Sequence, residues 1–161
     1  MGRRYNVTFK NVSVSASQDL IQIKGATGKM LKIIKAWWGC TNTTLPTSEL
    51  LSTEVHYLPA TVTDGSGGGA GTVSKIDPGD AAASLTALIN NTTPATTSGT
   101  LVVLDQSGDH LYNGYKSPLD WLDGKTAPVC GPSESICLAL IESPSTTVLL
   151  SGGVTVEEMG G

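Results

Sequence analysis

Charged side chains are scarce in this chain, and aromatic side chains are scarcer still. Asp, Glu, Lys and Arg make up 15% of the 161 residues, against about 25% in an average soluble domain. The exposed faces of long helices need Glu, Lys and Arg, so a chain rich in Ser, Thr and Gly favours strands and turns instead. A single Phe, four Tyr and three Trp leave the core mainly to aliphatic side chains.

The chain also lacks a basic region. Its net charge is −4, and the basic clusters are an Arg3-Arg4 pair and lysines at 29, 32 and 35. Lysines spaced three residues apart point to both faces of a strand and form no basic stripe. Because binders of nucleic acid carry a concentrated positive surface, we expect no nucleic-acid partner.

Long apolar runs are missing too. No segment approaches the roughly 20 apolar residues that a membrane-spanning helix needs. The opening residues, MGRRYNVTF, contain no apolar signal segment. We therefore expect no membrane association, and synthesis in the cytoplasm.

Cysteine is represented by Cys40, Cys130 and Cys137, an odd set with no CxxC motif and no nearby pair of histidines. A zinc site takes about four ligands, usually in close spacing, so the sequence predicts no metal centre. Buried thiols are the expected state. A Cys130–Cys137 disulfide remains an alternative, because sequence alone cannot establish the geometry that a disulfide requires.

The sequence offers no recognisable catalytic set. Its two histidines, His56 and His110, stand in no motif with a nucleophile, and no G-x-S-x-G turn occurs. The segment Asp105–Asp109 begins like a calcium loop. However, His110 replaces the required glycine and no Glu follows at the twelfth position, so we interpret the segment as a turn. We expect a protein that is not an enzyme and has no cofactor.

Residues 64–72 form a glycine-rich tract, DGSGGGAGT. A phosphate-binding loop would end in G-K-[ST], whereas here Gly71 leads to Thr72 and Val73. A dinucleotide fingerprint would need a βαβ unit, which the chain lacks. The tract is therefore predicted to be an exposed, flexible loop between two strands.

Alternating apolar and polar residues predict strands along most of the chain, as in Tyr5, Val7 and Phe9. Residues 29–40 are ambiguous, because their apolar positions also fit one face of a helix. The absence of a capping box and the Ile-Ile and Trp-Trp pairs favour a strand. In all we expect about eight or nine strands and no helix longer than one or two turns. Residues 1–161 should form a single all-β domain, an antiparallel β-sandwich or jelly-roll with long loops and a short N-terminal arm at residues 1–4.

Several local features are predicted as well. Asp77-Pro78-Gly79-Asp80 should form a turn with Gly79 at positive φ, and Asp80 should cap one helical turn. Residues 101–104 should form a short buried strand. Gly152-Gly153 should interrupt the last strand with a bulge or bend.

The Trp37-Trp38 pair is a candidate interaction site. Neighbouring residues of a strand point to opposite faces, so one ring can fill the core while the other remains outside. An outward Trp can anchor an interface or stack on a sugar, and we favour the interface. The irregular segment from His110 to Ser135 should pack over one end of a sheet. Together with the N-terminal arginines, the interface candidates are Arg3, Arg4, Trp37, Trp38, Tyr112, Tyr115 and Trp121.

Spaced motifs cover most of the chain. An R-x-Y-x-V-x-F opening is followed by V-x-V-S-A-x-Q-D-L, which ends at Leu20. The centre has the glycine tract, Gly79-Asp-Ala-Ala-Ala-Ser, Asn91-Thr-Thr-x-Ala and Ser98-Gly-Thr. The close has Ser143-Pro and Ser151-Gly-Gly-Val-Thr-Val-Glu-Glu-Met-Gly. In this pattern the chain resembles a family of small proteins encoded in the head-gene region of tailed bacteriophages.

The resemblance implies a structural virion protein, most plausibly a capsid decoration (cement) protein. Such proteins bind the major capsid protein on the outside of the shell, often as homotrimers, and the family has no catalytic residues to transfer. Trp37-Trp38 and the loop from Tyr112 to Pro132 depart from the family's pattern, which leaves the partner surface undefined there. The alternative is a carbohydrate- or receptor-binding tip of a tail or fibre, in which Trp38, Tyr112, Tyr115 and Trp121 form a stacking surface. A small hydrolase is the least favoured hypothesis.

Overall fold

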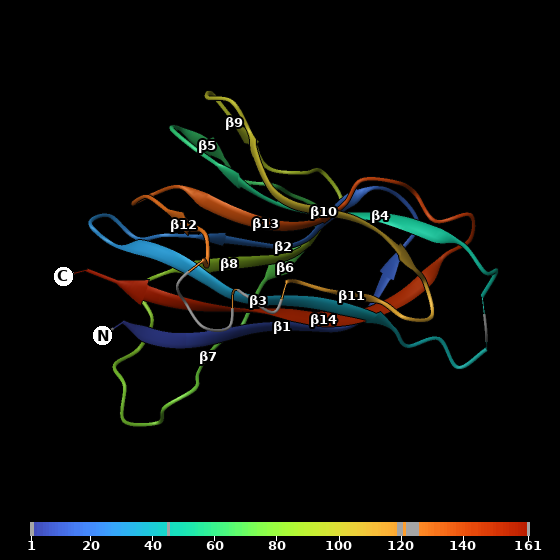
Figure 1. The fold of residues 1–161 in the computed structure, drawn as a ribbon, viewed down its shortest axis with the longest axis horizontal. Coiled ribbons are helices and arrows are strands. Elements are labelled where there is room, and N and C mark those ends of the chain that lie inside the picture. Colours follow the sequence, from blue (N-terminus) through green and yellow to red (C-terminus); the bar gives the residue numbers. More distant parts are fainter. Residues whose placement is uncertain (1, 45, 119–120, 122–125, 161) are drawn as a thin grey trace.

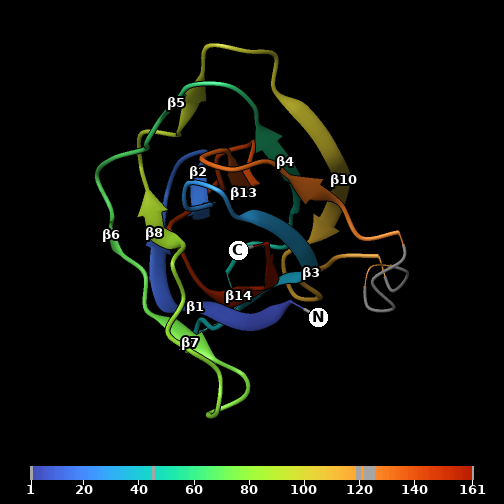
Figure 2. The same cartoon turned by 90° about the vertical axis from the view of Figure 1, so that its left-hand side faces the viewer.

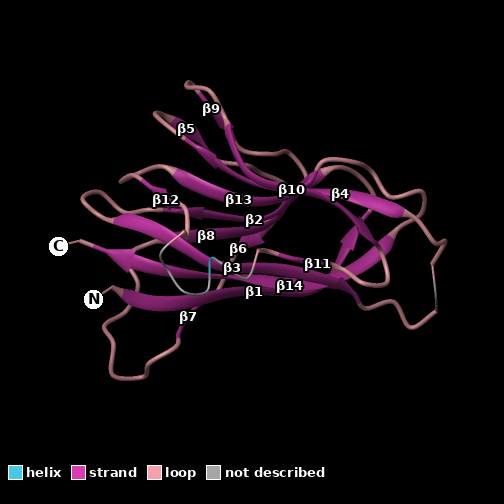
Figure 3. Ribbon diagram, viewed as in Figure 1, coloured by secondary structure: helices cyan, strands magenta, loops and turns pink. Residues whose placement is uncertain are grey.

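Two six-stranded antiparallel sheets pack face to face in the computed structural model, which describes residues 2–44, 46–118, 121 and 126–160 (Figure 1). The predicted all-β sandwich is confirmed, and magenta strands dominate Figure 3. The described residues form 14 strands instead of eight or nine, because short strands of two or three residues add to the long ones. Among the described residues, no helix is long and apolar enough to cross a bilayer.

The first sheet, sheet A, has the order β11-β3-β14-β1-β7, with β12 also paired to β3. Its strands are β1 (Arg3–Val14), β3 (Met30–Cys40), β7 (Val73–Lys75), β11 (Tyr115–Lys116), β12 (Val129–Cys130) and β14 (Val148–Met159).

The second sheet, sheet B, has the order β10-β4-β13-β2-β8-β6, and β5 pairs with β9 in a separate ribbon. The strands of sheet B are β2 (Gln18–Lys24), β4 (Leu50–Leu58), β6 (Gly69–Ala70), β8 (Thr86–Asn91), β10 (Val102–His110) and β13 (Ser135–Leu140). The ribbon consists of β5 (Val62–Thr63) and β9 (Thr96–Thr97).

The strand order is that of a jelly-roll. If the strands between β4 and β10 are set aside, together with β12, sheet A has the order β1-β14-β3-β11 and sheet B the order β2-β13-β4-β10. The chain therefore crosses repeatedly between the sheets, as two Greek keys require. Residues 59–101 are an excursion between β4 and β10 that contributes β7 to the free edge of β1 and β8 to that of β2.

The core lies between the sheets and is mainly aliphatic, as the composition predicts. Alternate residues of β1, including Tyr5, Val7 and Phe9, are buried against it. Residues 30–40 form a strand, which resolves the ambiguity with a helix. Ile33 and Ile34 are both buried because the pairing with β14 shifts by one residue at Ile34.

The predicted bulge does not fall at Gly152-Gly153, because both glycines pair in register with Trp38 and Trp37. The register shift beside them lies in β1, between Phe9 and Val12. The two glycines are needed for a different reason. A Cβ added at Gly153 would lie 2.7 Å from Cζ2 of Trp37, so the glycine makes room for the indole ring.

The glycine tract is largely exposed, as predicted, but it is paired to the edge of sheet B instead of forming a free loop. Ser66 and Thr93 exchange two backbone hydrogen bonds of 3.0 Å, and β6 then pairs with β8. A Cβ added at Gly68 would lie 2.0 Å from the carbonyl oxygen of Ile89. The glycines therefore allow the backbone to lie directly against the edge of sheet B.

The N-terminal arm expected at residues 1–4 is also wrong where the structure describes it; Met1 lies outside the described residues. Arg3 and Arg4 belong to β1 and pair with Glu158 and Glu157 of β14. Nε of Arg4 lies 3.3 Å from Oε2 of Glu157. The cross-strand charge pair favours an extended strand over a free arm.

The turn at residues 77–80 is confirmed, since the amide of Asp80 donates to the carbonyl of Asp77 at 3.1 Å. Its details differ from the prediction, because Gly79 has no positive φ and no helical turn follows Asp80. Instead, Oδ1 of Asp77 accepts a 2.9 Å hydrogen bond from the amide of Gly79. The Asp side chain closes the turn without needing left-handed backbone.

Residues 102–110 form one long edge strand, so two predictions fail there. Asp105–Asp109 is strand instead of turn, and Leu101, Val102 and Val103 are exposed instead of buried. An edge strand has one free side, so its residues need not alternate into a core.

Cys40, Cys130 and Cys137 are free thiols, which excludes the alternative disulfide. Cys130 lies in β12 of sheet A and Cys137 lies in β13 of sheet B. Cys137 and Cys130 are buried as expected, whereas Cys40 is partly exposed.

Candidate functional site

Three of the predicted interface residues, Trp38, Tyr115 and Trp121, are buried, so they are unavailable to a partner. Nε1 of Trp38 donates a 2.9 Å hydrogen bond to Oγ1 of Thr53, across the two sheets. The hydroxyl of Tyr115 donates at 2.6 Å to Oδ2 of Asp105. Burial, and then this carboxylate, raises the pKa of Tyr115. These two hydrogen bonds fix the orientation of the buried Trp38 and Tyr115 side chains.

The other aromatic candidates keep a surface role. Trp37 is partly exposed on the face opposite Trp38, as the strand alternation predicts, and Nζ of Lys35 lies 4.6 Å from its ring centroid. Tyr112 is 43% exposed, and its hydroxyl donates to the carbonyl of Pro46 at 2.6 Å. Of the four residues proposed to stack on a sugar, only Tyr112 is exposed, so the proposed stacking surface is wrong.

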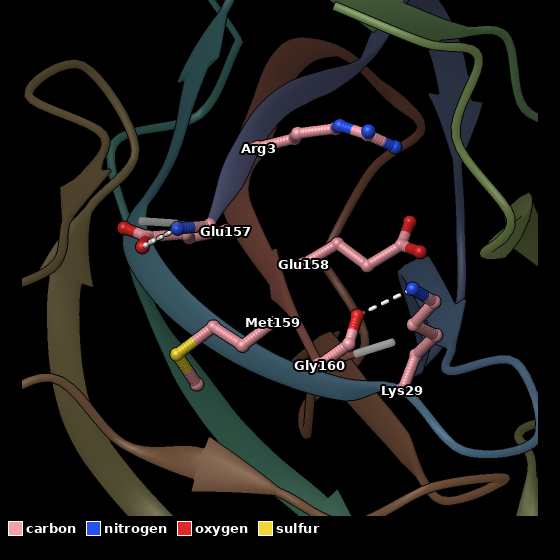
Figure 4. A pocket seen from close by; sticks show the side chains of 7 residues that line it. Arg3, Lys29, Glu157, Glu158, Met159 and Gly160 are labelled. Carbon is pink, nitrogen blue, oxygen red and sulfur yellow. Dashed lines mark hydrogen bonds between the residues drawn. The ribbon is translucent and has the colours of Figure 1, made fainter.

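Arg3 lines a pocket of about 520 Å³ where the two chain ends meet in sheet A (Figure 4). Three of its four charged side chains, those of Lys29, Glu157 and Glu158, have partners within the protein. Glu157 accepts from the amide of Gly2 at 3.0 Å, and Glu158 accepts from the amide of Ser84 at 3.1 Å. Figure 4 shows Lys29 reaching the carbonyl of Gly160. Internal pairing of these charges leaves the pocket little capacity to select a ligand.

An exposed apolar segment lies at the edge of sheet B, where β4 is the one strand among the described residues that pairs with β10. Leu101, Val102 and Val103 are 40%, 37% and 46% exposed, and we call these residues the β10 edge. Soluble proteins usually protect an edge strand with charge, proline or a covering segment. Leu101, Val102 and Val103 carry no charge and include no proline. The start of β10 therefore presents unpaired backbone groups together with apolar side chains.

A groove of about 270 Å³ runs over the outer face of sheet B. One wall belongs to the flap, by which we mean residues 59–66 and 92–101 with strands β5 and β9. In Figures 1 and 2 these strands stand above the outer face of sheet B. The groove has apolar walls and a polar floor; its lining is Ser17, Gln18, Asp19, Glu54, His56, Pro94, Ala95, Leu101, Ala139, Leu140 and Ile141.

Strand register places a buried cysteine next to an acidic residue and a histidine of this floor. Cys137 of β13 stands directly opposite His56 of β4, and Ala139 stands between Asp19 of β2 and Glu54 of β4. The ligand atoms of Asp19, His56 and Cys137 all lie within 4.8 Å of one another, and all three residues are buried. We call these three residues the Asp-His-Cys cluster.

Two contacts orient the cluster. The amide of Ala95, in the flap, donates a 2.7 Å hydrogen bond to Oδ2 of Asp19. Nδ1 of His56 lies 2.8 Å from Oε1 of Glu54. The distance is that of an ion pair, although the atoms are not aligned for a hydrogen bond. A small rotation of either side chain would align them.

The cluster is unsuited to nucleophilic catalysis. Burial, followed by the charge of Asp19, raises the pKa of the Cys137 thiol well above its usual range. Burial also raises the pKa of Asp19, against the opposing effects of the Ala95 amide and His56. A reactive cysteine needs a lowered pKa and an electropositive, accessible setting, and Cys137 has neither.

Sequence reasoning missed this cluster because its members lie on three different strands. One signal was available: Glu54 and His56 are two residues apart on a predicted strand, so they must share a face. The contribution of Asp19 and Cys137 depends on the β4-β13-β2 register, which local patterns do not encode.

Comparison of the chain with models of protein families, with curated proteins and with solved structures finds no match.

Proposed function

We propose that this protein is a structural virion component that binds the outside of a bacteriophage capsid and stabilises the shell. The proposal begins from the resemblance to small phage head-region proteins. A jelly-roll is compatible with it, since viral capsid domains use this architecture. Unrelated proteins use it as well, so the fold alone is weak support.

The observation that carries the proposal is the β10 edge. Leu101, Val102 and Val103 join exposed apolar side chains to the unpaired backbone of an edge strand. Such an edge can add a strand from another chain and bury its side chains in the same contact. We assign the shell contact to this edge, in place of the N-terminal arm that the sequence suggested.

A decoration protein repeats its contact many times over the shell. Many copies give each particle high avidity, so a small apolar edge can suffice for each subunit. From the same resemblance we propose the major capsid protein as the partner, a homotrimer as the favoured assembly, and the capsid exterior as the location. The proposal includes no catalytic step and no nucleic-acid or membrane partner.

Binding to capsid particles that lack the protein tests the proposal. Purified protein is added to the particles, and the bound copies are counted after sedimentation. We expect saturable binding and an oligomer by light scattering. No binding, together with a monomer, would refute the proposal.

Substitutions can assign the contact. Val103→Lys places a charge on the β10 edge and should lower the affinity at least about tenfold, because a buried unpaired charge costs more than 1.4 kcal/mol. Ser74→Lys places the same charge on exposed β7, an edge strand of sheet A, and should bind as the unmodified protein does. Equal losses for both variants would show that charge, not the β10 edge, governs binding.

The alternative function, a carbohydrate-binding tip, is not favoured by any comparable observation. Trp38, Tyr115 and Trp121 lie in the core and cannot stack on a sugar without unfolding. We therefore do not propose it.

A further inference from the structure

The Asp-His-Cys cluster combines the side chains that bind transition metals. Zinc is held by thiolate, imidazole and carboxylate ligands, typically in a tetrahedral arrangement. Asp19, His56 and Cys137 provide one ligand of each kind, with ligand atoms within 4.8 Å of one another. Ligands of a tetrahedral zinc ion are about 3.5 Å apart, so side-chain rotation must close a gap of about 1 Å.

Charge gives an independent indication. Asp19 and Glu54 are two buried carboxyl groups on either side of Ala139. Among the described residues, Arg4 lies beside Glu157 and Lys24 beside Asp64, whereas the basic side chain beside Glu54 is His56, which is charged only when protonated. Buried carboxylates normally have a cation beside them. A divalent ion would balance the charges of the Asp19 carboxylate and the Cys137 thiolate.

Glu54 occupies the position of an outer-sphere partner. A histidine that binds a metal through one nitrogen usually donates its other N–H to a carboxylate, which fixes the ring. Oε1 of Glu54 lies 2.8 Å from Nδ1 of His56, so Nε2 is the nitrogen that remains for an ion.

The groove supplies access. Asp19 and His56 both line its 270 Å³ volume, so an ion can enter from solvent and an open coordination position can hold water. The apolar flap residues Pro94, Ala95 and Leu101 cover the same region. The amide of Ala95 uses one oxygen of Asp19 and leaves the other carboxylate oxygen for coordination.

We propose that Asp19, His56 and Cys137 bind a divalent transition metal, with zinc as the best match, and that Glu54 orients His56 for this purpose. The ion joins β2, β4 and β13 beneath the flap. Binding displaces the proton of the Cys137 thiol, which passes to solvent. The proposal is independent of capsid binding.

Cobalt titration of metal-free, reduced protein tests the site, because Co²⁺ replaces zinc and its spectrum reports a thiolate ligand. We expect one equivalent to produce a sulfur-to-cobalt charge-transfer band and intense visible bands, both abolished by zinc. Zinc at about 100 times its dissociation constant should raise the melting temperature by roughly 5–10 °C, and a chelator should reverse the change.

Two thiol variants make the assignment specific. Cys137→Ala should abolish the charge-transfer band, whereas Cys130→Ala removes another buried thiol and should retain it. Glu54→Gln should keep the spectrum and weaken affinity about 10–100-fold, as expected when an outer partner of a histidine ligand is lost. Circular dichroism checks that each variant is folded.

Three results would overturn the proposal. The first is unmodified protein that shows neither the cobalt band nor zinc stabilisation; the cluster would then be a hydrogen-bonded group closed by the Cys137 and Asp19 side chains. The second is a charge-transfer band that persists in Cys137→Ala, which would place the metal on another thiol. The third is unchanged affinity in Glu54→Gln, which would remove Glu54 from the site.

Discussion

Gly68→Ala should destabilise the protein, although the sequence presents Gly68 as part of an exposed and tolerant loop. The new Cβ would lie 2.0 Å from the carbonyl oxygen of Ile89, and contacts below 3.0 Å essentially never occur. The obstacle is the backbone of β8, which cannot rotate away as a side chain could. The tract must therefore move by about 1 Å, from the difference between 3.0 and 2.0 Å.

A shift of this size would lengthen or break the hydrogen bonds that dock the tract on β8. The amide of Gly71 donates to the carbonyl of Ala87 at 2.8 Å, and Ser66 and Thr93 exchange two bonds of 3.0 Å. At about 1 kcal/mol for each bond, loss of these three bonds would cost about 3 kcal/mol. Partial relaxation makes about 2–3 kcal/mol the expected loss, or roughly 5–10 °C in melting temperature for a chain of this size.

The neighbouring glycine provides a matched control. A Cβ at Gly69 has no atom within 4 Å, and its φ is not positive. Gly69→Ala should therefore leave stability unchanged or raise it by about 0.5 kcal/mol, because alanine restricts the unfolded chain. Chemical denaturation compares the two variants, and hydrogen exchange at the Gly71 amide reports local undocking. Equal stabilities for Gly68→Ala and Gly69→Ala would refute the docked tract and support a flexible loop.

Further predictions concern the thiols, the tryptophans and the flap. Burial, with a contribution from Glu134, raises the pKa of Cys130 to about 12, so at pH 8 a disulfide reagent should modify Cys40 and reach Cys130 only after unfolding. Trp38→Phe should lower the free energy of unfolding by about 1–3 kcal/mol, since it leaves the buried hydroxyl of Thr53 without its donor. In the same denaturation experiment, Trp37→Phe should lower it by less than about 1 kcal/mol, the range of an exposed cation–π contact. If zinc binds Asp19, hydrogen exchange at the Ala95 amide should slow on adding the metal, because its acceptor becomes fixed; unchanged exchange would separate the flap from the site.

Much of the fold could be predicted from the sequence, because a strand with one buried face is encoded by its own alternation. The pattern of Tyr5, Val7 and Phe9 does not depend on which strand lies beside it. Trp37 and Trp38 point to opposite faces for the same reason. By contrast, β10 was partly missed because Asp105–Asp109 has turn-forming residues. An edge strand needs few apolar side chains, so its sequence can imitate a turn.

The features that could not be predicted depend on contacts between distant segments. The docking of Gly68 reflects the position of the β8 backbone, and a run of glycines looks the same whether it is free or closely packed. The Asp-His-Cys cluster likewise depends on register: a one-residue slip of β13 would turn Cys137 into the core and leave Asp19 and His56 without a thiol. Tyr115 and Trp121 were correctly expected to pack over a sheet, yet packing of that kind excludes them from an interface.

The excursion between β4 and β10 connects the groove and the proposed binding edge. It leaves β4 after Leu58 and crosses to the opposite edge of sheet B, where it forms β6. It then adds β7 to sheet A, forms β8 in sheet B, and returns through β9 to Leu101. On this return it covers the outer face of β13 and β2, which allows polar side chains to be buried outside the main core. The same path ends where β10 begins, so Leu101 lines the groove and also belongs to the β10 edge. Because one residue serves both surfaces, a change that loosens the flap should also alter the start of β10.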